Sequence, residues 1–474
     1  MNSPSSEFQL PFDGLALMAD PIHEYIMFTV PFSSPDNQEC TEKDLIDSPW
    51  MQRLRSIYQL QSARWVYPSA EHSRFQHSLG TMHVAGRLAK HLYPTLKQLL
   101  PDLPSSAFIE ELLRVTALLH DIGHGPFCHF FDHHFLAEFG LTHERIGQVI
   151  IRDHLAPLIR GLRRSPSGMF EPGEQLDPHD IAFLILKDPQ KDGRPYPAWL
   201  AYLQPLIGGI FTADNFDYVL RDSYMCGVAV GPVDLTRLIH YTLMTPQGLT
   251  IHRTGLPAFQ MFLNARLYLY SNVYYHRTTR AIDLHLAEIF RATMAKVFPK
   301  NPLDQMEAYQ NLTDWSLIET VRTWTKAKAR TLQHLGQEWK RVLSRNIKWK
   351  MAYMTLLPIH QVDHHAMPLQ AGYVESCIRA SLPSELKQLD FRVDLAHQDP
   401  RPINLLNMGG FQIYVYDPGT HTVEKETLQD FFEYLPVKIL QCRIFCEDHT
   451  HDRIVSQAAA RVMTQLRQPH STEV

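Results

Sequence analysis

Apolar and polar residues alternate with two different periods along this chain, and the change of period predicts where strands give way to helices. The stretch "MADPIHEYIMFTVPF" at 18–32 has apolar residues on both sides of a Pro and a polar turn, which predicts a hairpin. From about Asp47 the pattern becomes helical, because "SPWMQRLRSIYQLQ" places Trp50, Leu54 and Ile57 on one face.

Helical spacing dominates the middle of the chain. It occurs in "HSLGTMHVAGRLAKHLYPTLKQLL", in "FIEELLRVTALL" and in "HERIGQVIIRDHL", for which Thr142 is a suitable N-cap. The stretch at 161–198 is rich in Pro, Gly and charge and is predicted to include an irregular surface insertion. Helical patterning resumes in "NFDYVLRDSY" and in "FQMFLNARLYLYSNVYYHRTTRAIDLHLAEIF".

The last third of the chain changes character. The segments "FRVDLA", "FQIYVYD" and "KILQCRIFCE" alternate as strands do, and "IVSQAAARVMTQL" is typical of a closing helix. We therefore predict a mostly α-helical fold with a smaller α+β C-terminal lobe. The predicted division is an N-terminal arm at 1–16, a main helical domain at 17–315, and a helical linker with the α+β lobe at 316–474.

The composition is that of a soluble globular protein. Of 474 residues, 45% are hydrophobic and 20% charged, and the net charge is −5. No whole-molecule basic field would attract nucleic acid, and no apolar run reaches the roughly 20 residues that a membrane helix needs. Because no Lys or Arg precedes Lys43, we expect no signal peptide, and we predict a cytoplasmic protein without membrane attachment.

One stretch departs from this balanced charge. Residues 322–350 hold nine Lys or Arg and one acidic residue, Glu338. A run of this kind is usually a solvated helix face. The alternative is a contact with nucleic acid or a nucleotide.

The stretch "LLHDIGHGPFCHFFD" carries more polar groups than its apolar surroundings would predict. His120 and Asp121 end a helix that looks buried, and His124, His129 and Asp132 follow within a dozen residues. Burying such groups without partners costs several kcal/mol each. A bound metal ion would satisfy them and is the leading explanation.

Imidazole and carboxylate groups suit first-row divalent metals, and the sequence does not choose among Mn, Fe, Zn, Co and Ni. His120 and Asp121 can reach one ion if the backbone turns after them, which Gly123 makes easy. His77 and Asp214 are the natural suppliers of two further ligands. Taken singly, His77 also fits a hydrogen-bonded core residue, and Asp214 also fits an N-cap.

Further residues predict a ligand pocket beside this group. Asp214, Tyr218 and Asp222 are spaced by four residues, so they lie on one face of a helix. Arg266 and Tyr274 are eight residues apart and repeat that arrangement. Tyr274 fits an aromatic core stripe equally well, since "ARLYLYSNVYYH" is rich in tyrosine.

Together, these motifs resemble those of the HD-domain metal-dependent phosphohydrolases. The likeness is greatest to the deoxynucleoside triphosphate (dNTP) triphosphohydrolases, in the branch of the sterile-alpha-motif and HD-domain protein, although no sterile-alpha-motif domain is recognisable. It runs from "MADPIHEYI" through "RLRSIYQLQSARWVYPSAEHSRFQHSLG", "LLHDIGHGPFCHFFD", "THE" and "DNFDYVLRD" to "NVYYHR".

The resemblance implies a role for each residue that matches a family motif. The implied metal ligands are His77, His120, Asp121 and Asp214. The implied catalytic relay near the scissile α-phosphate is His124, Asp132 and His143. The implied substrate contacts are Gln59, Leu60, Arg74, His129, Tyr218, Asp222, Arg266 and Tyr274. Tyr218 would stack below the deoxyribose and exclude a 2′-hydroxyl. The implied regulatory nucleotide site contains Asp47, Gln52 and Arg55. For His129 and His143, structural hydrogen bonding is the alternative.

Two departures from the family pattern bear on these roles. The family's phosphate-binding lysine directly after the last metal ligand is Asn215 here, which removes a positive charge from the expected triphosphate site. Arg221 or Arg277 could supply that charge instead. In the regulatory site, basic residues of the family fall at Ala16 and Thr254, which favours a constitutive or differently regulated enzyme.

The first functional hypothesis is metal-dependent hydrolysis of dNTPs to deoxynucleoside and tripolyphosphate, with Mg2+ on the substrate phosphates. The alternative keeps the metal and acts on nucleoside monophosphates, cyclic nucleotides or oligonucleotides, which Asn215 favours. A second alternative is a non-catalytic nucleotide or nucleic-acid binding protein that uses residues 322–350. The family likeness further implies a homodimer or homotetramer with nucleotides at the subunit junctions.

Overall fold

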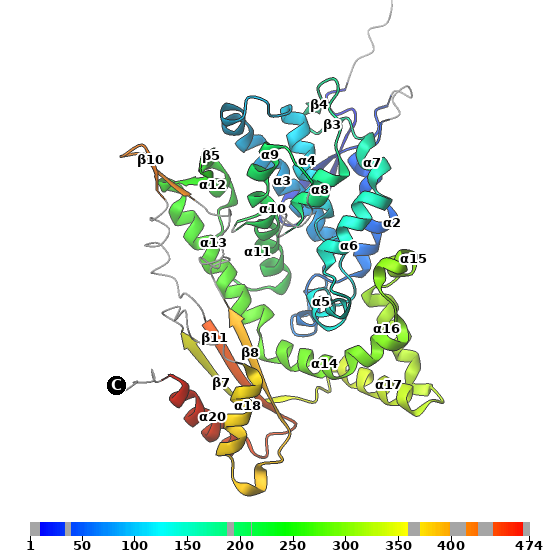
Figure 1. The fold of residues 1–474 in the computed structure, drawn as a ribbon, viewed down its shortest axis with the longest axis vertical. Coiled ribbons are helices and arrows are strands. Elements are labelled where there is room, and N and C mark those ends of the chain that lie inside the picture. The colour runs from blue at the N-terminus through cyan, green and yellow to red at the C-terminus, as the bar shows by residue number, and fades with distance from the viewer. Residues whose placement is uncertain are drawn as a thin grey trace, which may run out of the picture.

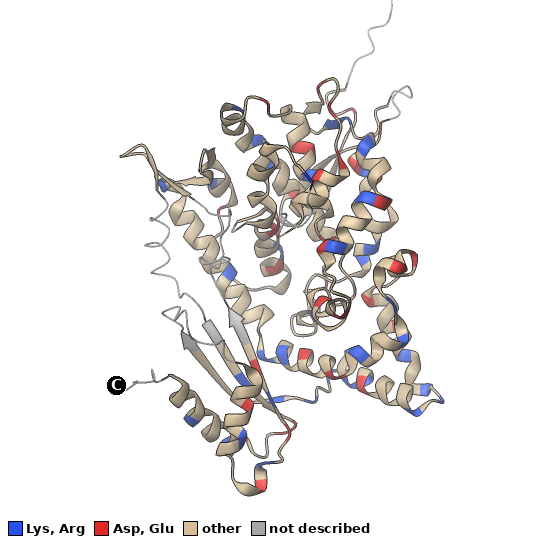
Figure 2. Ribbon diagram, in the orientation of Figure 1, with Lys and Arg blue, Asp and Glu red and all other residues tan. Residues whose placement is uncertain are grey.

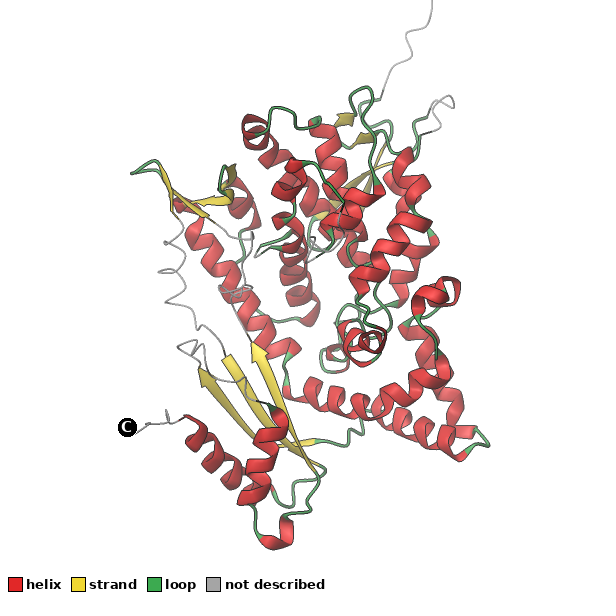
Figure 3. Ribbon diagram, viewed as in Figure 1, coloured by secondary structure: helices red, strands yellow, loops and turns green. Residues whose placement is uncertain are grey.

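The computed structural model describes residues 10–33, 39–186, 194–209, 211–358, 370–398, 414–424 and 439–467. Figure 1 shows a large helical body with a smaller lobe below it, and Figure 3 shows helices throughout the body and a sheet in the lobe. The predicted fold class, mostly α-helical with a smaller α+β lobe, is confirmed. Of the predicted N-terminal arm, residues 1–9 lie outside the described residues.

The described α-helices are α1 (Glu42–Ile46), α2 (Pro49–Arg53), α3 (Arg74–Leu99), α4 (Ser106–Leu119), α5 (His129–His134), α6 (His143–Val149), α7 (Ala156–Gly161), α8 (Pro178–Leu184), α9 (Ala198–Leu203), α10 (Pro205–Gly208), α11 (Ala213–Cys226), α12 (Leu235–His240), α13 (Leu256–Leu269), α14 (Arg277–Val297), α15 (Met306–Gln310), α16 (Asp314–Thr323), α17 (Arg330–Leu343), α18 (Ala371–Ser381) and α20 (Asp452–Arg467). The described strands are β1 (Leu15–Asp20), β2 (Glu24–Thr29), β3 (Arg164–Ser165), β4 (Gly168–Met169), β5 (Thr242–Thr245), β6 (Gly248–His252), β7 (Lys350–Pro358), β8 (Phe391–Gln398), β9 (Tyr414–Asp417), β10 (Thr422–Glu424) and β11 (Ile439–Cys446).

The N-terminal pattern gives the predicted hairpin but a shorter helix than predicted. β1 pairs antiparallel with β2. The helix expected to continue through "SIYQLQ" ends at Arg53, and a 3-10 turn follows. The chain turns because its backbone has distant partners: Tyr58 pairs with Ser73 and donates its N–H to Asp314 at 3.0 Å.

The long helical stretch around "ARLYLYSNVYYHRTTR" is broken in the structure. α13 passes into a π-helical turn at Tyr270–Tyr274, and α14 begins only after His276, whose side chain caps it by accepting from the N–H of Thr278. The sequence at 161–198 contains the β3–β4 hairpin and α8, so it is less irregular than predicted, and residues 187–193 lie outside the described residues.

Two hydrophobic cores organise the described residues. The larger core runs through the body and includes Val321, Trp339 and Val342, so α16 and α17 pack on it. The smaller core lies between α18, α20 and the antiparallel sheet β7-β11-β8. The predicted division after residue 315 stays a prediction.

One predicted strand of the lobe belongs elsewhere. β9, from the segment "FQIYVYD", pairs in parallel with β6 of the body, and residues 411–413 lie outside the described residues. Alternation identified the strand, but it cannot reveal the partner, because backbone pairing between distant segments is decided by the tertiary fold.

The basic stretch at 322–350 lies mainly on α17 and the turn before it. Figure 2 shows Lys and Arg on the outer side of these elements. Trp339 and Val342 point into the core, and Arg322, Lys326 and Lys340 are exposed. This arrangement is that of a solvated amphipathic helix. None of the helices in the described part of the chain combines the length and the apolar character that a membrane crossing needs.

A buried ion pair fixes the N-terminal hairpin to α4. Arg114 on α4 donates to both carboxylate oxygens of Glu42, at 2.7 and 3.1 Å, and to the carbonyl oxygen of Met27. Glu42 also accepts from the N–H of Thr29. Because both charged side chains are buried, the pair sets the position of α4, and the end of α4 leads into His120.

Replacing Arg114 with Met should lower the free energy of unfolding by about 3–5 kcal/mol, because Glu42 would stay buried without its partner. The matched control is Arg291→Met, which breaks an exposed pair with Glu138 and should cost at most about 1 kcal/mol. Urea unfolding at pH 7 measures both. Equal costs would show that the Glu42–Arg114 pair does not hold the hairpin on α4.

Candidate metal centre and substrate cavity

Three helices bring four candidate metal ligands together. α3 supplies His77, the end of α4 supplies His120 and Asp121, and the first turn of α11 supplies Asp214. His77 Nε2 lies 3.0 Å from Asp214 Oδ1 and 3.7 Å from Asp121 Oδ2. His120 Nε2 lies 3.4 Å from Asp121 Oδ2 and 3.8 Å from Asp214 Oδ1.

The donor atoms of this group fit a divalent cation. Atoms bonded to one metal ion at about 2.0–2.2 Å lie roughly 3–4 Å from each other, as these do. Among the described residues, neither His77 Nε2 nor His120 Nε2 has a hydrogen-bond partner, although both atoms are buried. Buried nitrogens of this kind need a partner, and a metal ion at the centre of the group would provide one.

The second nitrogen of each ligand histidine is held by the protein. His77 Nδ1 lies 2.8 Å from Asp217 Oδ2, one turn after Asp214 on α11. His120 Nδ1 lies 2.7 Å from the carbonyl oxygen of Ala117. Such hydrogen bonds fix the ring and direct the other nitrogen toward the metal position.

Asp217 is the centre of a buried polar network that the sequence motifs did not reveal. It contacts His23 at 2.7 Å and Arg221 at 2.8 Å as well as His77. Burial opposes ionisation, but the charge of Arg221 and these hydrogen bonds hold the pKa of Asp217 well below its usual value. A Cβ at Gly80 would lie 1.8 Å from Asp217 Oδ1, so glycine is required where α11 crosses α3.

The predicted relay residues lie directly behind Asp121. His124 Nε2 is 3.3 Å from Asp121 Oδ1, and the rings of His124 and His143 stack with centroids 3.7 Å apart. His143 Nδ1 lies 2.5 Å from Asp132 Oδ2. Gly123 allows this approach, because a Cβ there would lie 2.0 Å from the carbonyl oxygen of His143.

The surroundings of His124 and Asp132 set the charge that each of these side chains carries. Burial, reinforced by the charge of Arg74, holds the pKa of His124 well below its usual value, so the ring is neutral near pH 7. Burial acts against ionisation of Asp132, but hydrogen bonds from His129 and His143 lower its pKa. The side chains of His124, His129, Asp132 and His143 lie close enough together to hold a metal ion themselves. The ring stacking and the short His143–Asp132 contact instead fit a relay.

A single cavity of about 590 Å3 joins these groups to the predicted substrate residues. Its wall contains every predicted substrate contact, namely Gln59, Leu60, Arg74, His129, Tyr218, Asp222, Arg266 and Tyr274. His120, Asp121, Asp214 and His143 share the wall. His77, His124 and Asp132 lie behind it, in contact with these residues.

One end of the cavity is built from tyrosines around a carboxylate. The hydroxyl of Tyr274 donates to Asp222 Oδ2 at 2.6 Å, and His72 Nε2 lies 2.8 Å from Asp222 Oδ1. The ring of Tyr218 lies 6.4 Å from that of Tyr274. Tyr274 therefore belongs to the cavity wall as well as to an aromatic stripe.

Several polar atoms of the wall have no partner. Among the described residues that line the cavity, six buried atoms have no hydrogen-bond partner: Gln59 Oε1, His120 Nε2, Asn215 Oδ1, Tyr218 Oη, Arg266 Nη1 and Thr279 Oγ1. Buried polar groups in native proteins are nearly always hydrogen-bonded, so these atoms indicate a polar ligand.

Positive charge at the other end is limited. Arg74 forms an ion pair with Asp121, and its Nε donates a hydrogen bond to Cys128 Sγ at 2.9 Å. Of the two residues that could supply the charge missing at Asn215, Arg221 is buried and paired with Asp217 and Asp20. Arg277 is exposed and is not part of the cavity wall.

The predicted regulatory residues lie together at the surface, away from the cavity. Gln52 donates to the carbonyl oxygen of Ile46 at 2.8 Å, and Arg55 Nε donates to Gln52 Oε1 at 2.8 Å. Asp47 pairs with Lys43. A regulatory nucleotide at this place stays a prediction.

Sequence reasoning missed part of the wall. Gln61, Cys128, Tyr270, Tyr275 and Thr279 line the cavity but were not predicted. The tyrosines stand in the same aromatic stretch as Tyr274, and Asp217 stands in the motif "DNFD", so both signals were present but ambiguous.

Two family models match the chain. The HD domain matches residues 74–186, which include His77, His120 and Asp121, and the HD associated region matches residues 233–364. Asp214 lies between the two matched regions.

Known proteins resemble the chain over long stretches. An uncharacterized protein of Methanocaldococcus jannaschii is 34% identical over 287 residues, which are 59% of this chain and 51% of that protein. Deoxynucleoside triphosphate triphosphohydrolase SAMHD1 of Homo sapiens is 27% identical over 431 residues, which are 82% of this chain and 64% of that protein. The chain thus spans about half to two thirds of the length of these relatives.

The fold is also found in a solved structure. The crystal structure of a hypothetical protein from Aquifex aeolicus aligns with a TM-score of 0.66 at 23% identity and covers 95% of this chain and 100% of that one. Its likeness concerns the fold alone. With an HD domain followed by an HD-associated region, and with SAMHD1 among its homologues, the chain belongs to the HD-domain proteins.

Proposed function

We propose that this protein hydrolyses deoxynucleoside triphosphates to deoxynucleosides and tripolyphosphate in a metal-dependent reaction. One observation carries the proposal: the candidate metal ligands, the His124–His143 pair and the unpartnered polar atoms of the wall meet at one cavity of about 590 Å3. That volume suits a nucleotide. The similarity to SAMHD1 over 82% of this chain favours a dNTP.

His77, His120, Asp121 and Asp214 would hold the metal. When bound, the metal would place positive charge at the α-phosphate and acidify water. Arg266 and His129 would face the remaining phosphates, with Mg2+ as counter-ion. Among the described residues, Arg266 Nη1 has no hydrogen-bond partner.

The reaction adds water to the α-phosphorus and breaks its bond to the sugar 5′-oxygen, which must gain a proton. The predicted relay would carry this proton: His143 lies on the cavity wall and stacks on His124, which lies 3.3 Å from Asp121. Asp132 would hold His143 in place through their 2.5 Å contact. Positioned imidazoles of this kind contribute about 10²–10⁴-fold to rate.

The tyrosine end of the cavity would hold the nucleoside. Asp222 is fixed on both oxygens, by Tyr274 and by His72, so it cannot turn away from the cavity. Tyr218 would pack below the deoxyribose, where an added 2′-hydroxyl would meet the ring. This packing would select deoxynucleotides over ribonucleotides.

A second candidate substrate class is favoured by one observation. Asn215 supplies no positive charge, and neither Arg221 nor Arg277 compensates for it. A nucleoside monophosphate, a cyclic nucleotide or a short oligonucleotide presents fewer phosphate charges to the site than a triphosphate does, so it would need fewer cations there.

Product analysis distinguishes the two classes. We expect purified protein with each of the four dNTPs, and with Mn2+ or Mg2+, to release tripolyphosphate and deoxynucleoside without added GTP. Chromatography must separate tripolyphosphate from pyrophosphate and phosphate. Absence of turnover with every dNTP, with or without GTP, would transfer the assignment to the monophosphates, cyclic nucleotides and oligonucleotides, which are assayed on the same preparation.

The double substitution His120→Ala with Asp121→Ala should abolish metal binding and reduce kcat/KM by roughly 10³-fold or more, because two of four ligands are lost. Elemental analysis and the product assay measure the two effects. The control is His133→Ala, an exposed histidine on α5 that should change neither. Retained metal and activity in the double variant would refute the ligand assignment.

Replacing Asp217 with Asn should weaken metal binding about 10- to 100-fold, because His77 loses the carboxylate that orients it. Asp20→Asn is the matched control, since Asp20 contacts Arg221 but not His77. Competition with a chromophoric chelator measures both affinities, and circular dichroism checks folding. If the two variants bind metal equally well, Asp217 does not orient His77.

A further inference from the structure

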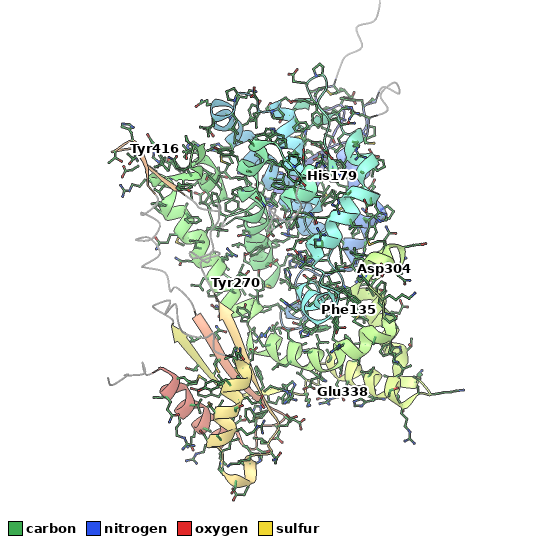
Figure 4. The ribbon with its side chains drawn as sticks, viewed as in Figure 1. Phe135, His179, Tyr270, Asp304, Glu338 and Tyr416 are labelled. Atoms are coloured by element: carbon green, nitrogen blue, oxygen red, sulfur yellow. The ribbon has the colours of Figure 1, made fainter. Side chains whose placement is uncertain are left out.

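The C-terminal lobe meets the body through a buried ionic network rather than through a shared core alone. Asp394 on β8 and Arg443 on β11 are register partners, and they are only 4% and 2% exposed. Arg443 Nη1 lies 3.3 Å from Asp394 Oδ2. Figure 1 shows this edge of the sheet beside the junction of α13 and α14, where Figure 4 labels Tyr270.

The network holds one wall of the substrate cavity. Arg443 Nη2 donates to the carbonyl oxygen of Tyr275, and Arg280 on α14 donates to Asp394 Oδ1 at 2.7 Å. Tyr275 and Thr279 both line the cavity. The lobe thus forms hydrogen bonds with the chain where the π-helical turn ends and α14 begins.

The same network reaches a second wall. Arg280 Nη1 donates to Asp283 Oδ2 at 3.2 Å, and Asp283 Oδ1 accepts from the hydroxyl of Ser62 at 2.5 Å. Ser62 is fully buried between Gln61 and Ala63, which both line the cavity. Two carboxylates and two guanidinium groups therefore connect the lobe to both walls.

The buried charges between the lobe and the body are better suited to fixing the position of the cavity walls than to stabilising the lobe. The smaller core of the lobe lies between its own helices and sheet, so the lobe does not need Asp394 to form a core. A buried ionic network adds little net stability compared with apolar packing, but it fixes geometry, because any displacement leaves a charge unpaired.

We propose that Asp394 is a positioning residue of the substrate cavity, through which the C-terminal lobe fixes the walls at 59–63 and 270–279. This inference rests on the proposed function for its kinetic readout. Breaking the network would loosen both walls and weaken nucleoside binding, while the metal centre, held by α3, α4 and α11, would keep its ligands.

The test compares Asp394→Asn with Asp390→Asn in the full-length protein. Asp390 is the matched control, because it lies in the same lobe and is 47% exposed in its side chain. We expect Asp394→Asn to raise KM for the dNTP about tenfold, as loss of a charged hydrogen bond does, with kcat changed less than about threefold. Metal content should be unchanged. Hydrogen exchange, measured without substrate, should accelerate at 59–63 and 270–279.

Unchanged KM and unchanged exchange at both walls would overturn the proposal, and so would loss of metal, which would indicate general unfolding. If the wild type hydrolyses no dNTP, the proposed function fails, and hydrogen exchange alone decides the inference. If Asp394→Asn does not fold, Ser62→Ala replaces it, because this change removes the last link to one wall without altering the lobe. Faster exchange at 59–63 would then support the proposal, and unchanged exchange would overturn it.

Discussion

The cost of burying imidazole and carboxylate groups governs the arrangement of the helical body. α3 and α4 are consecutive in the chain, whereas α11 begins only at Ala213, and each brings polar side chains that burial alone would destabilise. Asp217 lies on α11 and joins this helix to α3 through its hydrogen bond with His77. Arg221, also on α11, pairs with the same carboxylate. Gly80 allows the close crossing that this contact needs. A metal ion at the four ligands would complete the set, so metal binding and the packing of these helices should be coupled.

The cavity beside this centre has two ends with different chemistry. Near the metal ligands, the histidines and Asp132 form a hydrogen-bonded and stacked group suited to proton transfer. At the other end, Tyr274 and His72 fix the carboxylate of Asp222, and Tyr218 lies next to Tyr274. In the proposed function, the phosphates of the nucleotide would lie near the metal ligands and its nucleoside near the tyrosines. The shortage of cations near Asn215 bears on how many phosphates the site would accept.

The C-terminal lobe, which lies outside the HD domain, also contacts the residues that form the cavity walls. It has a core of its own, yet its buried charges make contact where the cavity walls end. The π-helical turn before α14 and the loop around Ser62 both depend on this contact. Irregular backbone next to a ligand site needs outside support, since it lacks the regular hydrogen bonds of a helix. The lobe provides that support from more than 100 residues away in sequence, as Arg280 and Asp394 illustrate.

The sequence by itself determined the helical class, the hairpin at the N-terminus and the identity of the residues around the candidate centre. Those features follow from local periodicity and from residue types that burial would otherwise penalise, as in the stretch from His120 to Asp132. The tertiary structure alone decided how these residues meet. Asp217 forms a hydrogen bond with His77, and Arg221 pairs with Asp20 and Asp217. Strand β9 pairs with β6. Such contacts join segments far apart in the chain, and neither spacing nor composition carries information about which distant partner a side chain or a strand will find.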